Sequence, residues 1–401
     1  MRLEELSNQI NDLKLEVMDL RAKQKMVSDN GSSASSTGFM VGDTSFKIGG
    51  YVDLDVNTTQ FSDGSVASKS AGRDFYFPNG TPIGGAKTQS TDFTAETSRL
   101  NFTATRDVNG TKVVGFLDFD LFGSAQGNER VTNSFSPRLR RAYIDFNNIR
   151  VGQEWTTFFN LYAFPESASF LAVSDGMIFM RQPQIRYTTG NFQFALENGN
   201  TTVAITDEAG STGSVEADSN MFPDAVVSYN LSGDYGKVSI AGILRELRYE
   251  TAGGIDEKDM GFALSLSGRL NVSEKDDIRF GLAGGDGLGR YIGLNTGNGA
   301  AFNPATGGLE AISSYGGFVA YRHPFGETAR VNLGVGYLSI DNPDFVSAAS
   351  TKSTQSAYAA VLWDIAPKVT MGVELLKGVK ELENADDGSI ARATFSTQFS
   401  F

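Results

Sequence analysis

Apolar and polar residues alternate in short runs from Phe46 to the end of the chain, and turn-forming residues separate the runs. A period of two places successive side chains on opposite faces of a β-strand. In the last run, residues 391–401, one face is apolar and aromatic and carries Phe395, Thr397, Phe399 and Phe401. Such a final strand is typical of a transmembrane barrel, whose last strand pairs with its first and leaves no open edge. The alternative for the same run is the edge strand of a soluble sandwich.

The alternation predicts sixteen strands in all. They cover residues 46–60, 92–106, 111–122, 138–147, 149–158, 183–189, 191–198, 224–232, 237–249, 261–272, 277–289, 310–323, 329–340, 355–365, 368–381 and 390–401. Short connections alternate with longer ones, and the longer ones include 61–91, 159–182, 250–260 and 382–389. We therefore predict an all-β fold, a sixteen-stranded antiparallel transmembrane β-barrel at residues 46–401, with both termini on the periplasmic side. A barrel of this size is wide enough to enclose water.

Residues 1–27 follow a different period. Spacings of three and four alternate along the a and d positions of a heptad, at Leu3, Leu6, Ile10, Leu13, Val17, Leu20, Gln24 and Val27. This seam predicts an N-terminal helix that forms a short parallel coiled coil between protomers in the periplasm. The alternative is an amphipathic helix that lies on the membrane or on its own barrel. Residues 28–45 are rich in Ser and Gly and are predicted to form a linker.

Composition narrows the classes of function. The 401 residues have a mean hydropathy of −0.20, and no apolar run reaches the roughly 18 residues that a membrane-spanning helix needs. One histidine and no cysteine disfavour metal sites and histidine-dependent catalysis, so we expect no metal, no cofactor and no enzyme activity. The net charge of −13 argues against nucleic acid as a partner.

Acids in the long connections are expected to face divalent cations and lipopolysaccharide at the cell surface.

Charged residues fall repeatedly on the strand face opposite the apolar one. The basic side chains expected to line the lumen are Arg99, Arg140, Arg141, Arg150, Arg186 and Arg279. Arg138 and Arg140 share the parity of Ala142, which is expected to face lipid, so a bulge or a rim position is needed to bring them inside. Trp155 is expected to face lipid. The arginines form either structural ion pairs with nearby acids such as Asp118, Asp120 and Asp145 or a ladder that attracts carboxylates.

The connection at 159–182 carries many apolar residues, among them Leu161, Phe164 and Phe170. A loop exposed to water does not carry so many. We predict that it folds inward and narrows the lumen, so that Glu154, Glu166, Asp175 and Arg181 lie at the constriction. The alternative is contact with a neighbouring protomer.

Several stretches resemble DcaP-type porins of Gram-negative bacteria. They are the N-terminal heptad helix, FKIGGYVDLD at 46–55, SRLNF at 98–102, RLRRAYIDF at 138–146, RVGQEWTTF at 150–158 and the terminal Phe. The resemblance implies a homotrimer of sixteen-stranded barrels in the outer membrane, a periplasmic coiled coil, and passage of small negatively charged solutes that include dicarboxylates. The arginines that match the family are Arg99, Arg138, Arg140, Arg141 and Arg150.

Three classes of function follow from these patterns. We expect a passive diffusion channel with an arginine-lined lumen that prefers small anions. A membrane enzyme would need a nucleophile beside the single histidine, His323, which lies at a short turn. A structural barrel would instead use residues 1–27 to bind peptidoglycan or a periplasmic partner.

Overall fold

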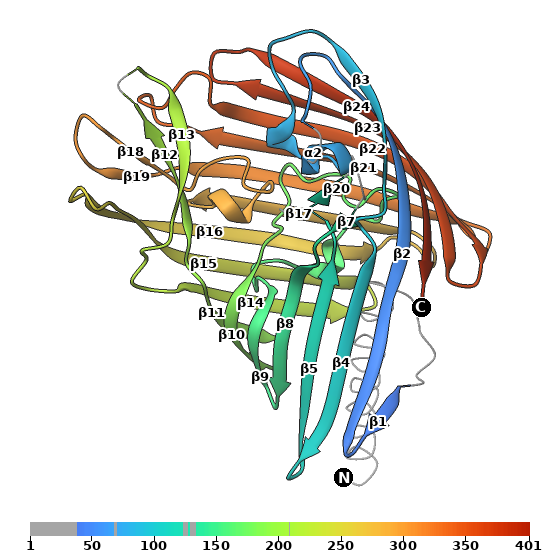
Figure 1. Cartoon of the computed structure of the whole chain (residues 1–401). Coiled ribbons are helices and arrows are strands. Elements are labelled where there is room, and N and C mark those ends of the chain that lie inside the picture. The colour runs from blue at the N-terminus through green and yellow to red at the C-terminus, as the bar shows by residue number, and fades with distance from the viewer. Residues whose placement is uncertain (1–37, 68–69, 123–126, 129–133, 208) are drawn as a thin grey trace.

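The part of the protein that the structure describes is an all-β barrel with almost no helix (Figure 1). The computed structural model describes residues 38–67, 70–122, 127–128, 134–207 and 209–401. The predicted coiled-coil helix at 1–27 lies outside the described residues. No described helix is long and apolar enough to cross a membrane.

Sixteen antiparallel strands close the wall, as the alternation predicts. In chain order they are β2 (Thr44–Phe61), β4 (Arg99–Val108), β5 (Thr111–Asp120), β8 (Arg138–Phe146), β9 (Ile149–Trp155), β10 (Arg181–Thr189), β11 (Phe192–Glu197), β14 (Asp224–Gly233), β15 (Gly236–Glu250), β16 (Asp256–Asn271), β17 (Asp277–Asp286), β20 (Ser313–Phe325), β21 (Ala329–Asp341), β22 (Thr351–Ala366), β23 (Val369–Leu382) and β24 (Asp387–Ser400). Each strand pairs with the next, and β24 pairs with β2 from Tyr51↔Ser400 to Phe61↔Ile390. The C-terminal strand therefore closes the barrel.

The start of the wall differs from the prediction in two places. The predicted strand 92–106 is interrupted at residues 95–98, because β3 (Thr88–Thr94) and β4 pair with successive halves of β2. The Thr97 hydroxyl donates to Asp53 Oδ2 at 3.0 Å within this interruption. The predicted linker 28–45 is also too long, because β1 (Phe39–Val41) and the first residues of β2 form a hairpin.

Some predicted loops contain regular structure. β12 (Thr201–Thr206), β13 (Thr212–Ala217), β18 (Ala300–Phe302) and β19 (Leu309–Ala311) form a four-stranded sheet beyond one end of the wall (Figure 1). A short hairpin joins β6 (Gly127–Asn128) and β7 (Ser134–Phe135). The expected long connections 250–260 and 382–389 are instead turns of five and four residues, at 251–255 and 383–386, because the flanking strands continue past them.

The outer surface of the wall is apolar. On β16, Phe262 and Leu264 are 53% and 54% exposed, whereas Ala263 and Ser265 beside them are buried. This alternation is required in a transmembrane barrel, since Arg or Lys facing lipid at the midplane costs about 2–4 kcal/mol.

Two connections fill part of the interior with an apolar core. One is residues 62–87, which hold α2 (Ala71–Asp74) and the 3₁₀ helix η1 (Pro78–Gly80); the other is residues 156–180, which hold η2 (Leu161–Ala163). Tyr76 from the first and Leu171 and Met177 from the second are at most 1% exposed and belong to one core cluster with Phe318 and Tyr358 of the wall. The connection 61–91 was expected only as a long loop. A third 3₁₀ helix, η3 (Gly289–Tyr291), follows β17.

Candidate functional site

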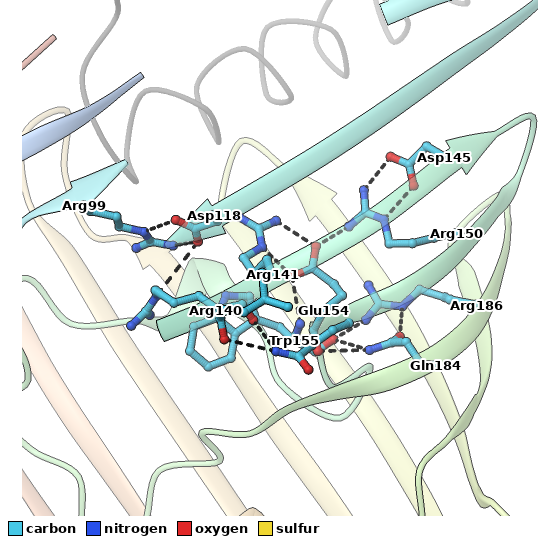
Figure 2. Close-up of polar contacts among 12 residues, drawn as sticks. Arg99, Asp118, Arg140, Arg141, Asp145, Arg150, Glu154, Trp155, Gln184 and Arg186 are labelled. Carbon is cyan, nitrogen blue, oxygen red and sulfur yellow. Dashed lines mark hydrogen bonds and ion pairs between the residues drawn. The ribbon is translucent and has the colours of Figure 1, made fainter. Parts of the chain in front are cut away.

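An array of arginines and carboxylates lies on the inner face of β4, β5 and β8 to β10 (Figure 2). At one end, Arg99 Nε donates to Asp118 Oδ1 at 2.6 Å. Arg138 makes two bonds of 2.8 Å to Asp120, and Arg140 Nη1 donates to the same carboxylate at 2.6 Å. Paired, bidentate contacts of this kind compensate the cost of taking charges out of water.

A β-bulge brings consecutive arginines to the same face. In the β5–β8 register, Asp118 pairs with Arg141 and Phe119 pairs with Leu139, so Arg140 is the extra residue. Leu139 is exposed on the outer face, whereas Arg140 is 2% exposed. The bulge required by the parity of Arg138 and Arg140 is therefore present, and both side chains reach Asp120.

The array continues toward the turn at 147–148. Arg141 makes two bonds to Glu154, of 2.6 and 2.7 Å, and Arg150 donates to Glu154 Oε2 at 2.6 Å. Arg150 also makes two bonds to Asp145, of 2.7 and 2.8 Å. The Arg150 guanidinium lies 3.9 Å from the centre of the Tyr143 ring, which fixes it further by a cation–π contact. Glu154 is thus a shared ion-pair partner and is 1% exposed.

Among the residues that the structure describes, no carboxylate bonds to two arginines of the array. Arg186 donates to Gln184 Oε1 at 2.9 Å and to the Trp155 carbonyl oxygen. Arg181 stacks over Trp155, with its guanidinium carbon 4.6 Å from the ring centre, and its buried Nη1 has no hydrogen-bond acceptor in the described part of the chain. Counting both, seven arginines belong to the array, and five carboxylates lie near them: Asp118, Asp120, Asp145, Glu154 and, from β11, Glu197.

The expectation that Trp155 faces lipid is wrong. Its ring packs against Phe159 and Phe179 of the inward connection, at centroid distances of 5.0 and 4.6 Å. Strand β9 ends at Trp155, so the chain turns inward there and the alternation no longer applies. The ring provides the flat surface on which Arg181 is held.

The connection 156–180 crosses from β9 to strands on the far side of the barrel. Asn160 Nδ2 donates to the Ser267 carbonyl of β16 at 3.2 Å. Glu166 accepts from Arg330 Nε at 2.7 Å and from Arg322 Nε at 3.0 Å, on β21 and β20. Arg279 of β17 donates to the Phe164 carbonyl at 2.7 Å. Glu166 and Arg279 therefore belong to a second charged cluster, separate from the arginine array.

Asp175 anchors the connection in place of facing an opening. It is fully buried, the Tyr76 hydroxyl donates to its Oδ1 at 2.8 Å, and Ser356 bonds to Oδ2. Glu374 of β23 is a second anchor, since it accepts from Ala168 N at 3.0 Å and from Ser169 Oγ at 2.6 Å. A side chain with 0% exposure does not face the lumen, which corrects the expected place of Asp175 at the constriction.

Stability should depend on pH through Asp175. Burial raises the pKa of this carboxyl from 3.8 to about 6, against the opposing hydrogen bonds from Ser356 and Tyr76. The folded protein therefore keeps a proton that the unfolded chain releases, and stability falls as pH rises from about 4 to about 6, by roughly 3 kcal/mol at most. We expect Asp175→Asn to raise the thermal unfolding temperature at pH 7 and to flatten its dependence between pH 4 and 6. An unchanged pH profile in this variant would show that Asp175 titrates normally.

Sequence reasoning missed Arg322, Arg330 and Tyr76. The two arginines flank the short turn after β20 and were not singled out as lumen residues, and Tyr76 lies in a connection with no regular period. Glu374 was expected to face inward, but its role as an anchor depends on a contact 205 residues away in the chain.

The described residues contain no cluster of three or more His, Cys, Asp or Glu side chains that could hold a metal ion. His323 Nδ1 lies 2.6 Å from Asp276 Oδ1, and the Ser273 hydroxyl donates to the other oxygen of the same carboxylate at 3.0 Å. The carboxylate stands between the serine and the imidazole, whereas a catalytic triad needs the imidazole in the middle. This trio does not form a nucleophile–base pair.

Comparison with known proteins agrees with this architecture. Residues 5–401 match the model of a family described as DcaP outer membrane protein. The crystal structure of the outer membrane channel DcaP of Acinetobacter baumannii is similar, with a TM-score of 0.76, 19% identity, and coverage of 91% of this chain and 99% of that one. An anion-selective porin from Comamonas acidovorans has a TM-score of 0.53 and 15% identity, over 89% of this chain and 100% of that one. OmpF of Salmonella typhi, in complex with daunomycin, has a TM-score of 0.53 and 11% identity, over 91% and 100%.

No curated protein sequence matches the chain. At these identities, the likeness to the solved structures concerns the fold alone, whereas the family match extends over nearly the whole sequence. With a closed wall of sixteen strands and a connection folded into it, the chain belongs to the DcaP outer membrane protein family and is an outer-membrane barrel of porin architecture.

Proposed function

We propose that the barrel is a passive diffusion channel that prefers small anions, carboxylates and dicarboxylates among them. The arginine array lines one side of its lumen, and the connection 156–180 narrows the passage beside it. A channel must bind its solute weakly enough to release it. A few free hydrogen-bond donors on the wall therefore fit a channel better than a closed binding pocket does.

The observation that carries the proposal is that Arg181 has no bonded carboxylate in the described part of the chain. Its guanidinium lies over the ring of Trp155, and the described part of the chain provides no carboxylate bonded to it. A cation held out of water without a partner is costly, so an arriving carboxylate gains an interaction that the protein has not already used. Arg186, whose hydrogen bonds within the described part of the chain go to neutral groups, extends this region of positive charge.

The paired arginines have a different role. Arg99, Arg138, Arg140, Arg141 and Arg150 each contact at least one carboxylate. They stabilise the wall and fix its charges, while the excess of arginine over acid sets the sign of the field. We therefore assign the structural role to these five arginines and the attraction of solute to Arg181 and Arg186.

Conductance across a salt gradient tests the proposal. The purified protein in a planar bilayer should show a reversal potential of the sign expected for anions, and succinate should partially block the chloride current. Succinate should act more strongly than the monocarboxylate propionate, because its second carboxylate is also attracted by the arginine-rich wall. Cation preference would mean that Asp118, Asp120 and Glu154 control the passage. Absence of any current would show that the two inward connections close the barrel.

The proposal includes an assembly. We propose a homotrimer in the outer membrane, with residues 1–27 as a periplasmic coiled coil that can also contact peptidoglycan, and with lipopolysaccharide around the outer rim. OmpT of Vibrio cholerae, which has a TM-score of 0.51 and 11% identity over 89% of this chain and 99% of that one, is described in a trimer form.

A further inference from the structure

A cavity of about 220 Å³, lined by polar side chains, lies between the end of the inward connection 156–180 and the four-stranded sheet. Met180, Asn200, Thr202, Glu216, Arg290 and Asn295 line it. These side chains come from 3₁₀ helix η3, from β12 and β13, and from the connections beside them. None of them belongs to the arginine array, although Met180 directly precedes Arg181.

Arg290 is the cation of this cavity, and its hydrogen-bond partners in the described part of the chain are neutral. Its Nη1 donates to the Asn200 carbonyl at 3.3 Å, and its Nη2 lies 3.6 Å from Met180 Sδ. Both contacts are long, and in the described part of the chain no carboxylate forms an ion pair with it. A half-buried guanidinium with such partners retains donors for a ligand.

Glu216 is the anion of the same cavity. Its Oε1 accepts from Asn200 Nδ2 at 3.2 Å, and Asn200 therefore contacts Arg290 through its carbonyl and Glu216 through its side chain. The two opposite charges line one cavity without bonding to each other. Asn295 accepts from the Thr202 hydroxyl at 2.9 Å, which leaves its amide N–H groups as further donors.

We infer that this cavity binds a small zwitterion of the α-amino acid class. The carboxylate of the ligand contacts Arg290 and its ammonium group contacts Glu216. A dicarboxylate would meet Glu216 with its second charge, so the cavity and the array around Arg181 select different solutes. The inference rests on the proposed channel function, because the ligand must reach the cavity through water in the lumen.

Alanine and propionate are a matched pair of probes, since they share a carbon skeleton and differ in the ammonium group. We expect alanine to block the chloride current of the full-length protein in a planar bilayer more strongly than propionate does. Glu216→Gln should weaken the alanine block about fivefold and leave propionate unchanged or stronger, whereas Arg290→Gln should weaken the alanine block about tenfold. Glu310→Gln is the control, because Glu310 lies on β19 of the same sheet, bonds to Asn303 and does not line the cavity.

Two results would overturn the inference. One is that alanine and propionate block the current equally and that Glu216→Gln changes neither block. The cavity would then bind the carboxylate alone, without recognising the ammonium group. The other is an alanine block that survives Arg290→Gln. The reversal potential, measured in the same experiment, reports the proposed channel function separately, because failure of that function appears as a missing anion preference in the unmodified protein.

Discussion

Replacing Arg181 with glutamine should lower the preference for anions more than any other single substitution in the arginine array. No carboxylate in the described part of the chain bonds to this guanidinium, so its removal takes away a positive charge without breaking an ion pair. At an effective dielectric constant near 20, a unit charge about 8 Å from the ion acts with roughly 2 kcal/mol before salt screening. We expect the chloride-to-potassium permeability ratio to fall about fivefold, and the block by succinate to weaken with it. Reversal potentials at low salt measure both.

The control for this prediction is a double variant that removes an ion pair. Arg150→Gln with Asp145→Asn deletes one positive and one negative charge from the same wall, and Glu154 keeps its contacts with Arg141. Because the net charge is unchanged, selectivity should also be unchanged. Equal losses in the two variants would show that the whole array, and not its unpaired member, attracts the anion.

The fold can be predicted from the sequence because apolar and polar residues alternate along the strands of the wall. Lipid on one side and water on the other impose a period of two, and the predicted strands agree with the observed ones within a few residues at most boundaries. The exceptions lie at residues 95–98, where two strands replace one predicted strand, and at strand ends, where pairing continues into the expected loops. β15 and β16 extend through the expected loop 250–260 because their residues pair up to Glu250↔Asp256.

The candidate site is harder to predict, because its properties depend on pairing between strands. Parity alone placed Arg140 toward lipid, and only the register between β5 and β8 shows the bulge that turns it inward. The sequence likewise does not tell which arginines have acidic partners: Arg99, Arg138, Arg140, Arg141 and Arg150 have them, whereas in the described part of the chain no carboxylate bonds to Arg181 or Arg186. Arg181 and Trp155 lie at the ends of β10 and β9, where strand geometry stops and contacts with the inward connection decide the direction of each side chain.

Replacing Gly176 with alanine should release the inward connection and raise the conductance. A Cβ at this position would overlap the backbone nitrogen of Gly317 and the carbonyl oxygen of Tyr337, and it would lie 2.6 Å from the carbonyl carbon of Gly316. These atoms belong to β20 and β21, whose backbone is fixed by the barrel, so the connection must move instead. Overpacking of this kind costs typically about 1–3 kcal/mol, and the anchors at Asp175 lie next to the displaced residue.

Widening of the lumen by Gly176→Ala should appear in two independent measurements. Single-channel conductance should rise roughly twofold, because the connection 156–180 no longer occupies the lumen. Liposome swelling should admit neutral sugars of larger size than the unmodified barrel admits. Gly115→Ala on β5 is the matched control, because a Cβ there meets no atom within 4 Å.

A variant that fails to assemble would not decide the matter, so Glu374→Gln provides a second route to the same displacement. This change weakens the bonds to Ala168 N and Ser169 Oγ without adding volume. If both variants assemble and neither changes conductance or the sugar size limit, the connection 156–180 does not set the width of the passage. The constriction would then lie along the other inward connection, at residues 62–87, whose Tyr76 holds Asp175 from the opposite side.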